Sequence, residues 1–225
     1  MNQRFRFLAS VAFCGAAALV CSPSAKATVQ ITLTNGASTA TVTDGGAGDV
    51  CAAVNCVTFS GALGNYIINV STGIAQQGNN PFLDLNSVNV AIAGNAGLLT
   101  IAMSSNDFTT SAQQFQFQVG GTSSLGGASS FAAYGGNSNT LFDTSHLIGS
   151  LSFPSSPYSG TTSPVTGTTA NPYSLTIVAQ LNGITAGSAS FDAALDMVPE
   201  PATMALLGVT LLLVAGGLRR KLRHT

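Results

Sequence analysis

The segment from residue 28 to residue 198 contains no lysine, arginine or glutamate. All seven basic residues lie nearer the two ends of the chain: Arg4, Arg6, Lys26, Arg219, Arg220, Lys221 and Arg223. The segment therefore lacks three strong helix formers, and glycines and β-branched residues interrupt its apolar runs. We expect it to fold as β-structure.

Apolar and polar residues alternate along much of this segment. Val29, Ile31 and Leu33 alternate with polar residues up to Asn35-Gly36, a pair typical of hairpin turns. Similar runs occupy residues 57–59, 66–70, 82–92, 98–103, 115–119, 147–153, 175–181 and 189–193. A period of two residues is that of a half-buried strand, and about ten short strands predict an all-β fold. The prediction is an antiparallel β-sandwich, of which the jelly roll is one form.

Two stretches are expected to be long surface loops: the Gly/Ser-rich residues 120–136 and the Pro/Ser/Thr-rich residues 154–172. Residues 45–49 read Gly-Gly-Ala-Gly-Asp, one residue short of a calcium-binding nonapeptide and present once. Because calcium-binding repeats need stacked copies, we interpret this stretch as a turn.

The segment holds two cysteines, Cys51 and Cys56. In an oxidising compartment this spacing favours a small local disulfide. A metal site would need further ligands, and His146 is the single histidine of the segment. We expect no metal and no cofactor.

The N-terminal residues have the organisation of a secretory signal peptide. Arg4 and Arg6 precede an apolar run over residues 7–20, and Ala25-Lys26-Ala27 forms an A-x-A cleavage site. Signal peptidase would then leave Thr28 as the first residue. The alternative is a lipoprotein signal with Cys21 as the lipidated residue, for which Val20 is a poor fit.

The C-terminal residues predict one membrane-spanning helix. Pro199-Glu200-Pro201 precedes an apolar run over residues 202–218, which as a helix would be about 26 Å long, close to the thickness of a bilayer core. A basic end follows directly, formed by Arg219, Arg220, Lys221 and Arg223. Such a cluster stays on the cytoplasmic side of the inner membrane, so the preceding chain would lie outside.

This order of Pro-Glu-Pro motif, apolar span and basic end resembles the PEP-CTERM sorting signal of Gram-negative bacteria that make exopolysaccharide. The resemblance implies a temporary anchor that an exosortase cuts, after which the protein reaches the cell surface or the extracellular matrix. The expected organisation is a signal peptide over 1–27, an extracytoplasmic domain over 28–198 and a sorting signal over 199–225.

Charge restricts the partners of residues 28–198. Seven aspartates against no Lys or Arg give this segment a formal charge of −7. Without cations to contact phosphates, nucleic-acid binding is excluded, and a polyanion would need bridging metal.

The segment offers little for catalysis. Asp143-Thr144-Ser145-His146 is its best cluster, but the members of a catalytic triad generally come from separate elements, so we interpret it as a polar turn. A hydrolase using Asp143 and His146, or paired aspartates acting on a glycosidic bond, is the alternative.

The sequence favours an exported, non-enzymatic structural protein of the cell surface or matrix. The first alternative is a polysaccharide-binding or adhesive module that stacks sugars of an exopolysaccharide on Tyr66, Tyr134, Tyr158 or Tyr173. The second is ice binding, since Thr39, Thr41 and Thr43 would share one face of a strand.

The first prediction concerns both ends of the mature protein. If the two signals are cut as their motifs imply, mass spectrometry of the surface-associated protein will find Thr28 as the first residue and nothing beyond Glu200 or Pro201. Recovery of residues 206–223 on the bulk of the mature protein would contradict the sorting prediction.

Overall fold

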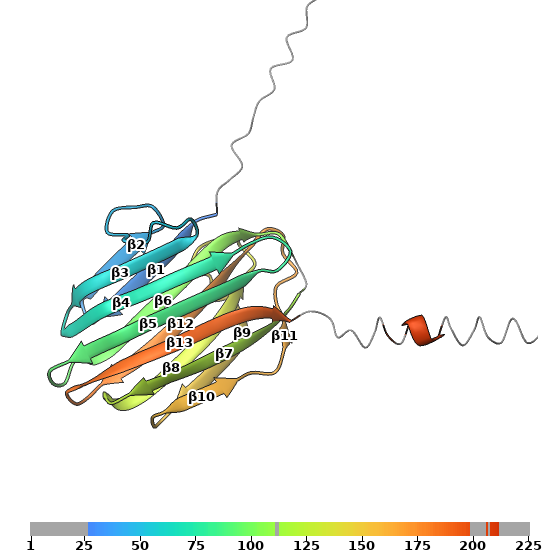
Figure 1. Ribbon diagram of the computed structural model, residues 1–225. Coiled ribbons are helices and arrows are strands. Elements are labelled where there is room, and N and C mark those ends of the chain that lie inside the picture. Colours follow the sequence, from blue (N-terminus) through green and yellow to red (C-terminus); the bar gives the residue numbers. More distant parts are fainter. Residues whose placement is uncertain (1–26, 111–112, 199–205, 207, 212–225) are drawn as a thin grey trace, which may run out of the picture.

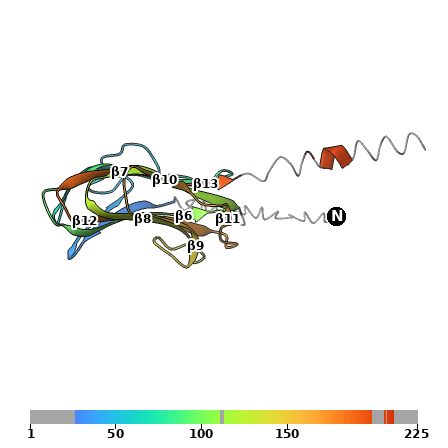
Figure 2. The same cartoon turned by 90° about the horizontal axis from the view of Figure 1, so that it is seen from below.

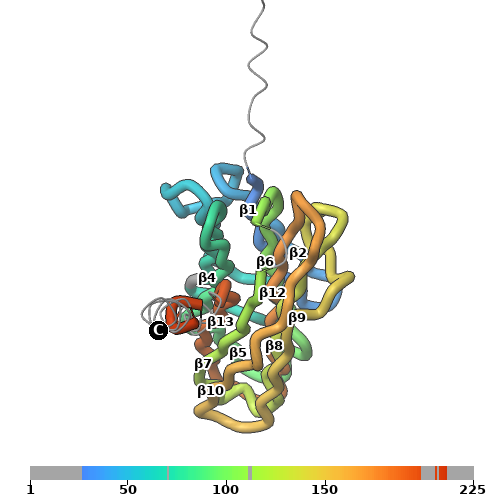
Figure 3. The backbone as a smooth tube through the Cα atoms, turned by 90° about the vertical axis from the view of Figure 1, so that its right-hand side faces the viewer, coloured from blue at the N-terminus to red at the C-terminus, as the bar shows by residue number. Residues whose placement is uncertain are grey.

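A computed structural model describes residues 27–110, 113–198, 206 and 208–211. The described residues form thirteen strands in two antiparallel sheets that pack face to face, as Figures 1, 2 and 3 show. The predicted all-β antiparallel sandwich is confirmed. β5 covers residues 82–92 as predicted, whereas β4, β6, β12 and β13 are 11 or 12 residues long and so exceed the predicted runs.

Sheet A has six strands. Their order across the sheet is β2 (Ser38–Thr43), β1 (Val29–Asn35), β6 (Gly97–Phe108), β12 (Tyr173–Gly183), β8 (Gly126–Gly136) and β9 (His146–Phe153).

Sheet B has seven strands. Six follow the order β10 (Tyr158–Thr161), β7 (Gln114–Ser123), β13 (Gly187–Val198), β5 (Phe82–Ile92), β4 (Tyr66–Gln76) and β3 (Cys56–Leu63). The seventh, β11 (Val165–Thr166), also pairs with β7.

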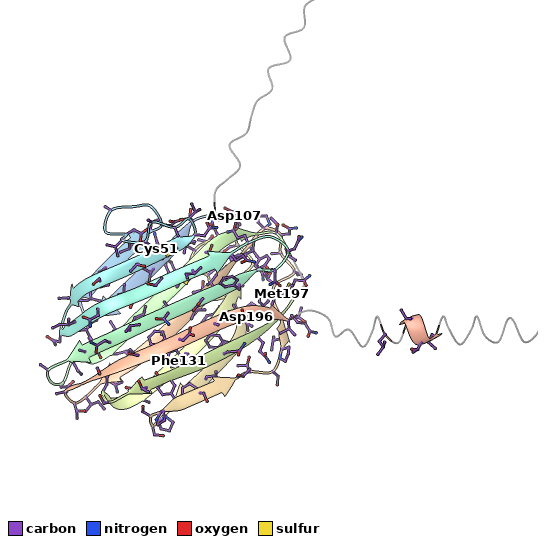
Figure 4. All side chains as sticks on the ribbon, in the orientation of Figure 1. Cys51, Asp107, Phe131, Asp196 and Met197 are labelled. Atoms are coloured by element: carbon purple, nitrogen blue, oxygen red, sulfur yellow. A yellow bond between two sulfur atoms is a disulfide. The ribbon has the colours of Figure 1, made fainter. Side chains whose placement is uncertain are left out.

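The core lies between the sheets, where the apolar residue of each alternation points inward. Val29, Ile31 and Leu33 are fully buried, as the period of two predicted. An aromatic contact joins the two layers: the rings of Phe131 on β8 and Phe191 on β13 are 5.1 Å apart between centroids. Figure 4 marks Phe131.

Tyr66 ties the sheets together through a buried hydroxyl. It lies on β4 of sheet B, and its hydroxyl donates to the carbonyl oxygens of Gly97 (2.7 Å) and Leu181 (3.3 Å) on sheet A. A buried polar atom is costly without a partner, so these contacts favour this alignment of the layers.

The long loop predicted over residues 120–136 is wrong, because these residues continue β7 and form the whole of β8. Residues 154–172 are mainly irregular, as predicted, but they contain the short strands β10 and β11. The glycines serve close packing: a Cβ on Gly127 would lie 2.4 Å from the Asn182 carbonyl oxygen, and one on Gly121 would lie 2.6 Å from that of Ser190. Glycine is required there because neighbouring atoms leave no space for a side chain.

Cys51 and Cys56, the first residue of β3, form the predicted disulfide, and Figure 4 marks Cys51. Asp49 organises the same connection, because its carboxylate accepts backbone N–H groups of Gly45, Cys51 and Thr58, each at 2.9 Å. The contacts support the interpretation of residues 45–49 as a turn.

Three carboxyl groups lie on the outer face of sheet B: Asp84 on β5, and Asp192 and Asp196 on β13. Burial raises the pKa of Asp84 to about 7, with further contributions from a hydrogen bond to Asp192 and from the charges of Asp192 and Asp196. Burial also raises the pKa of Asp196, against a hydrogen bond from Gln118. The protonated form of Asp84 is therefore the one that the fold favours.

The disulfide should contribute modestly to stability. Replacing Cys51 with Ser opens a short loop, for which the loop-entropy estimate is about 2 kcal/mol of unfolding free energy. Urea denaturation of the variant, with and without reductant, measures the loss. Equal stability of wild type and variant under oxidising conditions would contradict the prediction.

The carboxyl cluster predicts that the fold loses stability as the pH rises. Because the pKa of Asp84 is higher in the folded than in the unfolded chain, its contribution is complete below about pH 4 and is lost as the pH passes 7. Asp84→Asn mimics the protonated acid and should be more stable than wild type at pH 8 by about 1 to 2 kcal/mol, allowing for solvent screening.

Urea denaturation from pH 4 to pH 8 tests this difference. Thr39→Asn, at an exposed position on β2 of the other sheet, adds an amide without changing any carboxyl group; it is the control and should keep the pH dependence of the wild type. The same slope in wild type and Asp84→Asn would contradict the role given to Asp84.

Candidate functional site

The predicted sorting signal follows directly on the last strand, since β13 ends at Val198. Figure 4 marks Asp196 and Met197 near this end of β13. Most of the predicted signal lies outside the described residues, including Pro199, Glu200, Pro201 and the basic end Arg219, Arg220, Lys221 and Arg223. Leu206 and residues 208–211 are helical, and none of the helical stretches in the described part reaches the length and apolar character needed to span a bilayer.

The start of β1 and the end of β13 lie on the same side of the sandwich. Val29 pairs with Ser105 near the end of β6, and Val198 pairs with Gln114 at the start of β7; residues 109–113 join these two strands. Ala25 lies outside the described residues, whereas Ala27 is buried and the Thr28 amide donates to Asn106 Oδ1 (2.8 Å).

Asp143 and His146 lie at the connection between β8 and β9, where each has its own partner. The Asp143 carboxylate accepts hydrogen bonds from Ser138 and Ser145, and the side-chain bond from Ser138 is the main cause that lowers its pKa to about 2. His146 Nε2 lies 3.0 Å from the carbonyl oxygen of Thr166. A carbonyl oxygen can only accept, so this contact is a hydrogen bond in the tautomer that has its proton on Nε2.

Three of the four tyrosines considered for sugar stacking are in the core, so that prediction is wrong for them. Tyr66, Tyr158 and Tyr173 are 0%, 8% and 1% exposed. Their side chains fall on the inward phase of their strands, where a large ring buries the most apolar area. Tyr134 is half-buried and lies at the edge of an outer groove.

The outer face of sheet A carries rows of small neutral side chains, and we call it the hydroxyl face. Its members stand directly opposite one another across the six strands, and none of them is charged. The first row is Thr39, Thr34, Thr100, Gln180, Ser130 and Ser152. The second row is Thr41, Thr32, Ala102, Val178, Ala132 and Ser150.

Threonines of β1 and β2 pair across the first two strands of this face. Thr32 Oγ1 and Thr41 Oγ1 are 3.1 Å apart, and Thr34 Oγ1 and Thr39 Oγ1 are 3.4 Å apart. The sequence predicted an outward face for the threonines of β2 and put Thr32 and Thr34 on the polar side of a half-buried strand, but it did not predict that the two sets lie opposite one another. The alternation of Thr32 and Thr34 before the Asn35-Gly36 turn was the available signal.

A groove of about 430 Å³ lies at the other side of the hydroxyl face, over β12, β8 and β9. Its lining includes Ser130, Ala132, Tyr134, Ser150, Ser152 and Gln180. Residues 137–145, between β8 and β9, cover the part of this outer face that lies next to the two rows. The Phe142 amide donates to Ser104 Oγ (2.9 Å), and both Ser104 and Thr176 are buried.

The outer face of sheet B has a different character. Two hollows of about 480 and 250 Å³ share Gly120 and Asp192, and Asp196 lines the larger one. No group of three or more potential metal-ligating side chains is arranged for a metal ion among the described residues. The two rows of the hydroxyl face are thus neutral, whereas the outer face of sheet B carries carboxyl groups. Asp107 and Asp143 belong to the end of sheet A where residues 137–145 lie, beyond the two rows.

Solved structures with a partly similar arrangement include sugar-binding and adhesin domains and also domains of enzymes, such as the enzymatically active domain of a bacteriophage tailspike protein and an isomalto-dextranase from Arthrobacter globiformis T6. The PA14 sugar-binding domain of an RTX adhesin has 12% identity and a TM-score of 0.31, covering 49% of this chain and 71% of that one. A calcium- and xylotriose-bound carbohydrate-binding module, CBM36, has 18% identity and a TM-score of 0.27, covering 47% and 76%. The K1 cleaved adhesin domain of Lys-gingipain from Porphyromonas gingivalis W83 has 9% identity and a TM-score of 0.29, covering 76% and 90%.

No curated protein matches the chain. A family model described as the PEP-CTERM protein-sorting motif matches residues 198–221. The match begins at Val198, the last residue of β13. The chain therefore carries the PEP-CTERM sorting motif of an exported exosortase substrate.

Proposed function

We propose that this protein is a non-enzymatic structural component of the cell surface or extracellular matrix. The observation that carries the proposal is the position of the sorting motif, which begins at the last residue of β13. β13 is an interior strand of sheet B, paired with β7 on one side and β5 on the other. The sorting motif therefore begins where the sandwich ends, and the sandwich is the part of the chain that this motif would deliver outside the cell.

The side chains considered for catalysis have structural partners, which supports a non-enzymatic role. Asp143 is held by Ser138 and Ser145, and His146 contacts a carbonyl oxygen.

The composition of the fold also suits a structural role outside the cell. Residues 28–198 contain no Lys or Arg, so the sandwich rests on apolar packing and backbone hydrogen bonds between strands. Salt screens interactions between exposed charges and leaves these contacts unchanged. The disulfide further stabilises the connection before β3 in an oxidising compartment.

The proposal predicts retention without turnover. Fractionation of cells that produce the wild-type chain should place the processed protein in the surface or matrix fraction. Wild type and His146→Ala should show the same retention and no activity on ester, peptide or glycoside substrates, because His146 serves only a local contact. Deletion of residues 199–225 is the control and should abolish retention through the sorting route.

Turnover by wild type that is lost in His146→Ala would overturn the proposal and make residues 143–146 an active site. A processed protein found only in the culture medium would overturn the structural role while leaving export intact.

A further inference from the structure

We propose that the hydroxyl face of sheet A binds a neutral polysaccharide that lies flat across its strands. The inference rests on the proposed function, because a surface or matrix protein meets such polymers where it is retained. It assigns the binding to one face, and it excludes the outer face of sheet B.

Charge separates the two faces as docking surfaces. The outer face of sheet B presents carboxyl groups, with Asp192 and Asp196 lining one hollow, and these would repel an acidic polymer and attract a cationic one once ionised. The two rows of the hydroxyl face contain only Thr, Ser, Gln, Ala and Val. The partner that would gain the most binding free energy from contact with this face is itself uncharged and rich in hydroxyl groups.

The side chains of the hydroxyl face match the chemistry of a sugar surface. A threonine or serine hydroxyl both donates and accepts, as a sugar hydroxyl does, so either partner can adapt to the other. The exposed pairs Thr32–Thr41 and Thr34–Thr39, at 3.1 and 3.4 Å, can exchange this contact for one with a ligand. Methyl groups of threonine, Ala102 and Ala132 supply apolar contact for sugar ring faces.

Binding to this face costs little conformational entropy. Threonine and valine are stiff about χ1, and alanine has no rotamers to lose. Ordering a long side chain in an interface costs about 0.5 to 1.5 kcal/mol, and the two rows hold a single long side chain, Gln180. A broad array of weak hydroxyl contacts can therefore add up to useful affinity.

The geometry favours a flat, extended ligand. Neighbouring strands are about 4.8 Å apart, and outward residues along a strand are about 6.7 Å apart, so the hydroxyls form a regular grid. The grid runs from β2 to β9 and ends in the groove of about 430 Å³ beside Tyr134. Tyr134 is half-buried there and provides an aromatic edge on this path.

The test compares two matched serines on edge strands of opposite sheets. Ser150 is exposed on β9 within the hydroxyl face, and Ser159 is exposed on β10 of sheet B. Ser150→Lys puts a long charged side chain into the grid, and Ser159→Lys adds the same side chain outside it. The processed protein recovered from cells is measured for binding to cellulose and curdlan as neutral glucans and to alginate as an acidic polymer.

We expect wild type and Ser159→Lys to bind a neutral glucan with similar affinity. Ser150→Lys should bind it at least about tenfold more weakly, because a long charged side chain inside the interface would prevent close contact. Tyr134→Ala should also weaken binding, and thermal melts of each variant show whether the fold is intact. Equal neutral-glucan binding by the two lysine variants would overturn the inference, as would wild-type binding to alginate alone.

Two further outcomes would assign the face to another partner and so overturn the inference. One is ice-growth inhibition that Ser150→Lys abolishes without any glucan binding. The other is a concentration-dependent dimer that Ser150→Lys dissociates. Retention in the surface or matrix fraction without binding to either glucan would end the inference and leave the proposed function standing.

Discussion

Apolar contact between the two sheets is the interaction on which the other features depend. Residues 28–198 contain no Lys or Arg, so ion pairs of these residues cannot align the layers. Alignment comes from inward side chains on every second position, including the contact of Phe131 with Phe191. Tyr66 adds a directional hydrogen bond between the sheets, because its hydroxyl lies within hydrogen-bonding distance of two carbonyl oxygens of the opposite sheet. Both outer faces owe their positions to this packing.

The sequence predicted the fold class and the direction of many side chains, because a period of two residues is a local property. Val29, Ile31 and Leu33 point inward as expected. The Gly/Ser-rich composition of residues 120–136 predicts a loop, because glycine is common in turns, but glycine is also common where backbones approach closely, as at Gly121 and Gly127. A local pattern does not distinguish these two uses.

The hydroxyl face could be predicted only in part. Thr39, Thr41 and Thr43 were assigned to one face of a strand, and they share it. The rows that continue to β8 and β9 depend on pairings between distant parts of the chain, such as Thr100 with Gln180 and Gln180 with Ser130. The same non-local order decides that Tyr134 borders the groove while Tyr66, Tyr158 and Tyr173 enter the core.

The position of β13 has a mechanical consequence. β13 is hydrogen-bonded to β7 and to β5, and it ends where the sorting motif begins. A force applied at Val198 acts along the strand and loads both ladders in shear. Because ladder hydrogen bonds run perpendicular to the strands, many of them must yield together before β13 can slide. Drag on the domain while it is still anchored would therefore meet the resistance of two whole ladders rather than the opening of one edge.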